Sequence, residues 1–66
     1  MQVTLNGAGT EVPEDTTVAG LLAARTPGHG RVAVARNGDV VPRSAWETTG
    51  LAEGDVLEVL APTAGG

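Results

Sequence analysis

A single amphipathic helical segment, flanked on both sides by hairpin signals, most constrains how this chain can fold. Val18, Leu21 and Leu22 fall on one face of a helix predicted for residues 17–25. Residues 15–17 (Asp-Thr-Thr) are all of types that cap a helix, and Pro27 requires the helix to stop before it. One short helix can cover only one face of a sheet, so the other face must meet water or a partner.

Five segments have the alternation of β-strands or lie beside turn signals; they are residues 1–5, 10–12, 31–36, 39–41 and 56–60. Residues 6–9 and the pair Asn37-Gly38 tolerate positive φ and predict hairpin turns. Ser44 begins a Ser-Ala-Trp-Glu capping box that predicts a brief helical turn with Ser44 as its cap. The order strand, strand, helix, strand, strand, turn, strand predicts an α+β domain.

The last predicted strand has the sequence Val-Leu-Glu-Val-Leu, with Glu58 at its centre. Because successive side chains of a strand point to opposite faces, an exposed Glu58 predicts that Leu57 and Val59 face the core. Val56 and Leu60 then lie on the opposite face. We expect an apolar patch there, where a partner protein can bind.

Charge and composition exclude several kinds of partner. The 66 residues contain four Arg and no Lys against eight acidic residues, for a net charge of −4, which opposes nucleic-acid binding. No apolar run approaches the roughly 20 residues of a membrane span, and residues 1–5 lack the basic and apolar regions of a signal peptide. We therefore expect no nucleic-acid or membrane partner and a cytoplasmic location.

Few side chains could carry chemistry. The chain has no cysteine, one histidine (His29) and one serine (Ser44), with no sign of a paired base, so we expect no catalytic residues, no bound metal or cofactor and no enzymatic activity. Trp46 is expected to be a packing residue. Glu11, Glu14 and Asp15 predict a solvated acidic edge.

Residues 61–66 show no burial pattern, so we expect a domain over residues 1–60 and a flexible tail over 61–66. The tail ends in Gly65-Gly66. Without Cβ atoms, these two residues can pass through a narrow channel and present an unhindered carboxylate. Activating that carboxylate would require a nucleotide-using partner, because nothing in this chain could do it.

Several stretches of the sequence carry a family resemblance; they are residues 1–7 (MQVTLNG), 15–22 (DTTVAGLL), 32–38 (VAVARNG) and 40–46 (VVPRSAW), Gly54-Asp55 before residues 57–59 (LEV), and Gly65-Gly66. Through them, over essentially its whole length, the chain resembles ThiS-type sulfur carriers of thiamin biosynthesis, in the ubiquitin-like β-grasp family. The resemblance implies a β-grasp fold, with a mixed sheet of four to five strands, one main helix packed on one face and a short helical turn.

The resemblance also implies a reaction cycle. An E1-like adenylyltransferase would use ATP and magnesium to adenylate the carboxylate of Gly66. A cysteine desulfurase or a rhodanese-type protein would then supply sulfur, and the resulting thiocarboxylate would donate it to thiazole synthase. The tail residues Thr63, Ala64 and Gly65, together with the face carrying Val56 and Leu60, would bind the partners. Because the chain lacks cysteine, any sulfur that it carries must be on the carboxylate.

Other functions fit the same residues. A sulfur carrier could serve molybdopterin synthesis, tRNA thiolation or a natural product. Alternatively, the chain could be a ubiquitin-like interaction module or a covalent modifier of other proteins. The sequence leaves open the sulfur donor, the acceptor pathway, the oligomeric state and whether the tail is ordered without a partner.

Overall fold

The computed structural model describes residues 1–25 and 31–60 of the chain. The expectations for His29 and for the tail residues 61–66 lie outside the described residues. The elements in chain order are β1 (Gln2–Leu5), β2 (Ala8–Glu11), α1 (Val18–Arg25), β3 (Ala33–Arg36), β4 (Asp39–Val41), the short 3-10 helix η1 (Arg43–Ala45) and β5 (Val56–Leu60).

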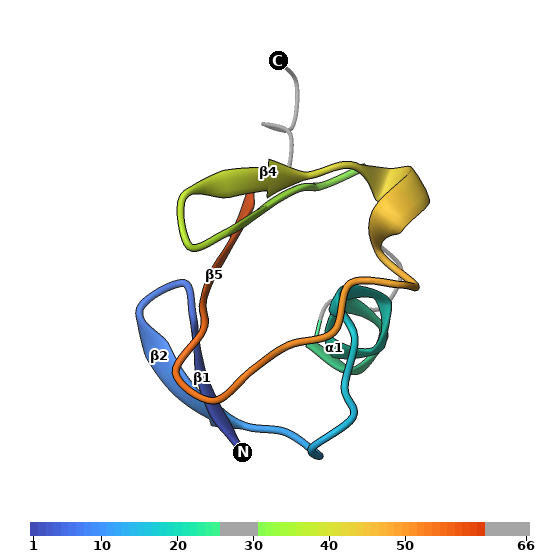
Figure 1. Cartoon of the computed structure of the whole chain (residues 1–66). Helices are drawn as coiled ribbons and strands as arrows, with labels where there is room; N and C mark the ends of the chain where they lie inside the picture. Colours follow the sequence, from blue (N-terminus) through green and yellow to red (C-terminus); the bar gives the residue numbers. More distant parts are fainter. Residues whose placement is uncertain (26–30, 61–66) are drawn as a thin grey trace.

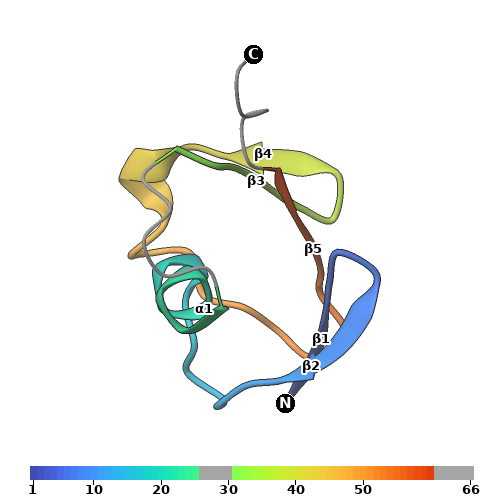
Figure 2. The ribbon, with the colours of Figure 1, turned by 180° about the vertical axis from the view of Figure 1, so that it is seen from behind.

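The strands form one mixed five-stranded sheet in the order β2-β1-β5-β3-β4. β1 and β5 are parallel, whereas the pairs β1–β2, β3–β4 and β3–β5 are antiparallel. Figures 1 and 2 show the sheet curving around α1, which lies on its concave side. This arrangement confirms the predicted β-grasp fold. It also puts the last strand, β5, in the middle of the sheet.

Both hairpins turn on an Asn-Gly pair. Asn6 and Gly7 have φ of 50° and 84°, and Asn37 and Gly38 have φ of 51° and 88°. Positive φ at both positions gives the two-residue turn that matches strand twist. The turn predicted over residues 6–9 was too long, because two residues suffice and Gly9 already pairs with Thr4 in the ladder.

The helix begins where its cap was predicted. The Gly20 N–H donates to Thr17 Oγ1 at 3.1 Å, which satisfies one of the free donors of the first turn. The segment after η1 satisfies two more, since Val18 N–H donates to the Thr49 carbonyl and Ala19 N–H to the Trp46 carbonyl, both at 3.0 Å. α1 is therefore fixed to the chain that leads into β5.

The brief helical turn lies where it was predicted, but Ser44 is not its cap. The capping position is Pro42, which has an extended backbone and makes no side-chain cap hydrogen bond. The proline ring fixes φ, here −64°, so the turn begins earlier and Ser44 is already inside it. The Ala45 N–H closes the turn on the Pro42 carbonyl at 2.9 Å.

The core fills the space between α1 and the concave side of the sheet. Its buried apolar residues are Val3, Val12, Val18, Leu21, Leu22, Val34, Val41, Leu51, Leu57 and Val59. Trp46 packs against this cluster, and its Nε1–H donates to the Val41 carbonyl at 2.9 Å. The guanidinium of Arg43 lies 5.1 Å from the Trp46 ring centroid. These contacts confirm Trp46 as a packing residue.

Candidate functional site

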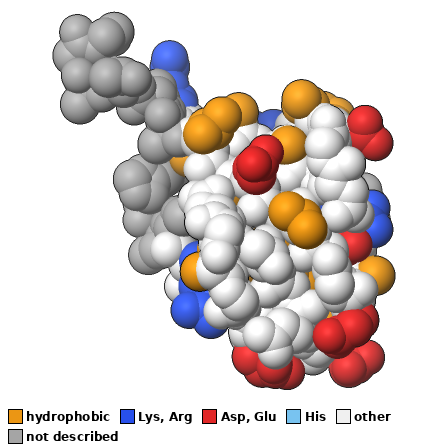
Figure 3. Space-filling view, turned by 90° about the vertical axis from the view of Figure 1, so that its left-hand side faces the viewer, with side chains coloured by type: hydrophobic (Ala, Val, Ile, Leu, Met, Phe, Trp, Pro, Cys, Tyr) orange, Lys and Arg blue, Asp and Glu red, His pale blue; other side chains and the backbone are white. Residues whose placement is uncertain are grey.

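The sheet face turned away from α1 is largely apolar at its centre. We define the outer sheet face by the outward-pointing residues of three neighbouring strands, namely Ala33, Ala35, Val40, Val56, Glu58 and Leu60. Its large side chains are strongly exposed: Val40 to 76%, Leu60 to 70% and Val56 to 46%. In Figure 3, which views the molecule from this side, separate apolar groups lie around an acidic one. The predicted division of β5 into buried and exposed residues is confirmed.

A buried carboxylate fixes the start of β5. Asp55 is 6% exposed; its Oδ2 accepts hydrogen bonds from Arg36 Nε at 2.7 Å and from Ala52 N–H at 2.8 Å, and its Oδ1 accepts one from Asn37 Nδ2 at 3.0 Å. Burial by itself would raise the pKa of the Asp55 carboxyl, but these hydrogen bonds outweigh it and the pKa is lowered. The Val56 N–H in turn donates to Asn37 Oδ1 at 2.9 Å, so the β3–β4 hairpin holds the first residue of β5.

A second asparagine holds the end of β5. β1 stops at Leu5, and beyond it the side chain of Asn6 continues the pairing with β5. Asn6 Oδ1 accepts from the Val59 N–H at 2.8 Å, and Asn6 Nδ2 donates to the Val59 carbonyl at 3.2 Å. On the β1 side the strand is thus held as far as Val59, and on the β3 side Leu60 itself pairs with Ala33. Six residues separate Leu60 from the end of Gly66, and an extended chain of that length spans at most about 20 Å.

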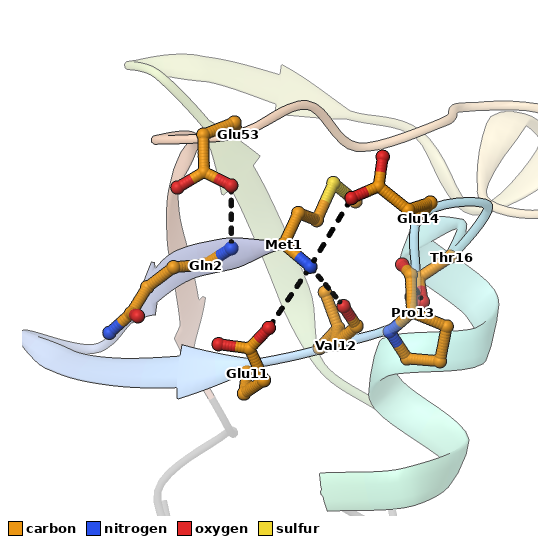
Figure 4. Close-up of polar contacts among 8 residues, drawn as sticks. All are labelled: Met1, Gln2, Glu11, Val12, Pro13, Glu14, Thr16 and Glu53. Carbon is orange, nitrogen blue, oxygen red and sulfur yellow. Dashed lines mark hydrogen bonds and ion pairs between the residues drawn. The ribbon is translucent and has the colours of Figure 1, made fainter.

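The N-terminal end of the sheet gathers other charges. The Met1 ammonium donates to Glu11 Oε2 at 3.1 Å and to the Val12 carbonyl at 2.7 Å, and lies 3.7 Å from Glu14 Oε2 (Figure 4). The hydrogen bond to Glu11 raises the pKa of this amino group. Both carboxylates remain exposed, as expected of a solvated edge. Because β1 and β5 are parallel, this cluster lies at the opposite end of the sheet from Leu60.

Two surface hollows accompany the helix. One, of about 410 Å³, is lined by Ala19, Arg43, Ser44, Trp46 and Glu47. The other, of about 350 Å³, lies between α1 and the chain that leads into it from β2. Neither brings a hydroxyl together with a histidine among the described residues. Across residues 1–25 and 31–60, no three potential metal-ligating side chains of His, Cys, Asp or Glu come together.

None of the helices in the described ranges has the length and apolar character needed to cross a membrane.

Of the residues proposed for partner binding, the structure brings Val56 and Leu60 together on the outer sheet face. The tail residues Thr63, Ala64, Gly65 and Gly66 lie outside the described residues. Sequence reasoning missed the side-chain roles of Asn6, Asn37 and Asp55. Both asparagines were explained by their turns, and no local pattern signals that their amides also reach β5.

The sheet is mixed and curves around one helix, and its middle strand is the last one before the tail. This arrangement defines a ubiquitin-like β-grasp protein. The model of the ThiS family matches residues 3–66, so this chain belongs to the ThiS family. It shares 35% identity with the crystal structure of the thiamine biosynthesis protein ThiS from Geobacter metallireducens, with a TM-score of 0.85 and full coverage of both chains.

An NMR solution structure of a thiamine biosynthesis protein from the same organism is also 35% identical, with a TM-score of 0.80 over 100% of this chain and 88% of the other. A comparison with curated proteins gave no match. Membership of the ThiS family supports a role as a sulfur carrier in thiamine biosynthesis.

Proposed function

We propose that this protein carries sulfur for thiazole ring formation as a thiocarboxylate on Gly66. The observation that carries the proposal is that the ThiS family match extends to residue 66 and so includes Gly65-Gly66. The way β5 is held supports it further. Asp55 and Asn37 fix the start of this strand, and Asn6 fixes its end, so the tail leaves from a rigid element.

The chain supplies the reacting carboxylate, and its partners supply the chemistry. An E1-like adenylyltransferase, using ATP and magnesium, joins a carboxylate oxygen of Gly66 to AMP and releases pyrophosphate. A persulfide from a cysteine desulfurase or a rhodanese-type protein then attacks the carbonyl carbon, and AMP leaves. A thiol cleaves the resulting S–S bond to release the thiocarboxylate, which thiazole synthase uses as its sulfur donor. This carrier therefore needs no catalytic residue, metal or bound cofactor of its own.

Partner binding divides between the tail and the outer sheet face. Gly65 lacks a Cβ, and Ala64 and Thr63 are small, so this segment suits a narrow channel in the activating enzyme. Val56 and Leu60 give that enzyme, and thiazole synthase, an apolar surface directly before the tail.

Replacement of Leu60 by glutamate tests the docking surface. Leu60 is 70% exposed, so the change should leave the free energy of unfolding within about 0.5 kcal/mol of the wild-type value. Binding to both partners, measured by titration calorimetry, should weaken because a charge enters an apolar contact. Unchanged dissociation constants would refute this part of the proposal.

Intact-mass spectrometry tests the carrier chemistry. The protein is incubated with ATP, magnesium, the E1-like partner and a sulfur donor, and we expect one oxygen to be replaced by sulfur at Gly66. A chain lacking Gly66 is the matched control and should remain unmodified. An unmodified wild-type mass, with the partner active on another carrier, would instead favour an interaction module. Conjugates on lysines of other proteins would favour a covalent modifier.

Growth identifies the acceptor. Expression of the protein in a strain that lacks its own thiazole sulfur carrier should restore growth without added thiazole. Thiocarboxylate formation without this rescue would assign the carrier to another pathway, such as molybdopterin synthesis, tRNA thiolation or natural-product sulfur insertion.

A further inference from the structure

A single negative charge lies within the apolar outer sheet face. Glu58 lies between Val56 and Leu60 along β5 and pairs in register with Ala35 of β3. Ala35 pairs in turn with Val40 on β4. The neighbours of Glu58 in the direction of β3 and β4 are therefore apolar as well. A charged side chain surrounded by apolar ones restricts which protein surfaces can bind here.

The described part of the chain supplies no partner for this carboxylate. Within residues 1–25 and 31–60, the Glu58 side chain takes part in no ion pair or hydrogen bond. Arg36, on the neighbouring strand, forms an ion pair with Asp55 at 2.7 Å. Arg36 lies two residues after the buried Val34, so its side chain points to the opposite face of the sheet from Glu58. Among residues 1–25 and 31–60, no other side chain therefore neutralises Glu58.

Covering the outer sheet face would remove water from Glu58. Burying an ionised carboxylate without a partner is strongly unfavourable, whereas a charge-assisted hydrogen bond within an apolar surround is among the stronger contacts an interface can make. A binding protein that covers Val56 and Leu60 must therefore cover or closely approach Glu58. It gains most from doing so if it presents a cation there, because a cation both donates a hydrogen bond and neutralises the charge.

We propose that Glu58 determines which protein can dock on the outer sheet face, and that the occupant is the adenylating enzyme, through an apolar surface carrying one Lys or Arg side chain aimed at Glu58. This inference rests on the proposed function for the identity of the occupant. That enzyme must hold the carboxylate of Gly66, and the tail can extend no more than about 20 Å from Leu60. An enzyme that binds the tail is thus beside the outer sheet face.

The dissociation constants of the variants Glu58→Gln and Glu58→Leu show whether the enzyme presents a cation to Glu58. If the enzyme supplies a cation, Glu58→Gln should raise the dissociation constant about ten- to a hundredfold, the range expected for losing one hydrogen bond to a charged group. Glu58→Leu should weaken binding at least as much, because it leaves the cation facing an apolar group. If the enzyme were apolar throughout, Glu58→Leu would instead tighten binding.

Glu47→Gln is the matched control. Glu47 is exposed beyond η1, away from the outer sheet face, and its replacement makes the same change in net charge. We expect it to change the dissociation constant less than twofold. A loss equal to that of Glu58→Gln would mean that only overall charge matters and would overturn the inference. Urea unfolding should confirm that all three variants fold as the wild type does.

Steady-state adenylation gives a second measurement. Glu58→Gln should raise the KM of the enzyme for the carrier in parallel with the dissociation constant and leave kcat unchanged, because Glu58 contacts the enzyme surface and not the reacting atoms. A lower kcat at unchanged KM would refute the inference, and so would a defect seen only with thiazole synthase.

The two hypotheses can fail separately. Binding is measured without ATP, so it does not depend on the chemistry at Gly66. If the wild-type protein binds and the Glu58 variants weaken binding, but mass spectrometry shows no thiocarboxylate, then the proposed function fails and the docking inference stands. If the thiocarboxylate forms and Glu58→Leu binds as tightly as the wild-type protein, only the docking inference fails.

Discussion

Replacing Asp55 by asparagine should remove much of what holds β5 to the β3–β4 hairpin. The buried Asp55 carboxylate accepts three hydrogen bonds, from Arg36, Asn37 and the Ala52 N–H. An asparagine side chain keeps one acceptor oxygen and places an NH₂ group against donors. At least one donor therefore loses its partner, and the charge opposite Arg36 is gone.

The cost follows from these contacts. A hydrogen bond to a charged group contributes about 1.5–3 kcal/mol, and a buried donor left unpaired costs about 1–3 kcal/mol. The Arg36 side chain is 34% exposed, so water can partly replace its lost partner. We expect Asp55→Asn to lower the free energy of unfolding by about 2–3 kcal/mol. That is a large part of the roughly 3–10 kcal/mol available to a chain of this length.

Urea unfolding at neutral pH measures this difference, with Asp39→Asn as the matched control. Asp39 is exposed at the start of β4, and its replacement should change stability by less than about 0.5 kcal/mol. A loss for Asp55→Asn as small as that of the control would refute the reasoning.

The pH dependence provides an independent check. The pKa of Asp55 is lower in the folded protein than in the unfolded chain, so its stabilising effect is complete above the unfolded value of about 4 and disappears as the pH falls through the folded value. The stability difference between the wild-type protein and Asp55→Asn should therefore narrow as the solution is acidified below about pH 4. A difference that stayed constant down to about pH 2 would contradict the assigned hydrogen bonds.

Three further substitutions test how β5 is held and which face of the sheet is buried. Asn6→Gly keeps the positive φ of the turn accessible and removes both side-chain hydrogen bonds to Val59. We expect the free energy of unfolding to fall by about 1–3 kcal/mol and hydrogen exchange at the Val59 amide to become faster. Unchanged exchange would refute the role given to Asn6. In urea unfolding, Leu57→Ala, at a fully buried position, should lower the free energy of unfolding by about 2–5 kcal/mol. Val40→Ala, at a position 76% exposed, should lower it by less than about 0.5 kcal/mol. Equal losses would contradict the assignment of the two faces.

Local patterns were enough to predict most of the elements. The alternation in residues 56–60 divides buried from exposed side chains correctly, and the cap of α1, Thr17, is one of the three residues predicted as possible caps. Asn37-Gly38 forms the predicted turn. These features depend only on residues close together in the chain, where backbone preference and burial act together.

Features that join distant segments could not be derived in the same way. No local pattern in residues 1–5 shows that β1 runs parallel to β5; the mixed sheet was expected only from the family resemblance. Asn6 and Asp55 suit turns and loops, so their local role hides their contacts with distant backbone or side chains. Ser44 failed as a cap because Pro42 starts the turn earlier.

The position of β5 also affects when the protein can fold during its synthesis. Until residues 56–60 have been made, β1–β2 and β3–β4 are two separate hairpins with no strand between them. Isolated hairpins are marginally stable in water, so the sheet forms only after its last strand arrives. Nascent chains and fragments that lack β5 therefore have no outer sheet face. A partner that binds this face discriminates finished, folded molecules from incomplete ones without any separate checkpoint.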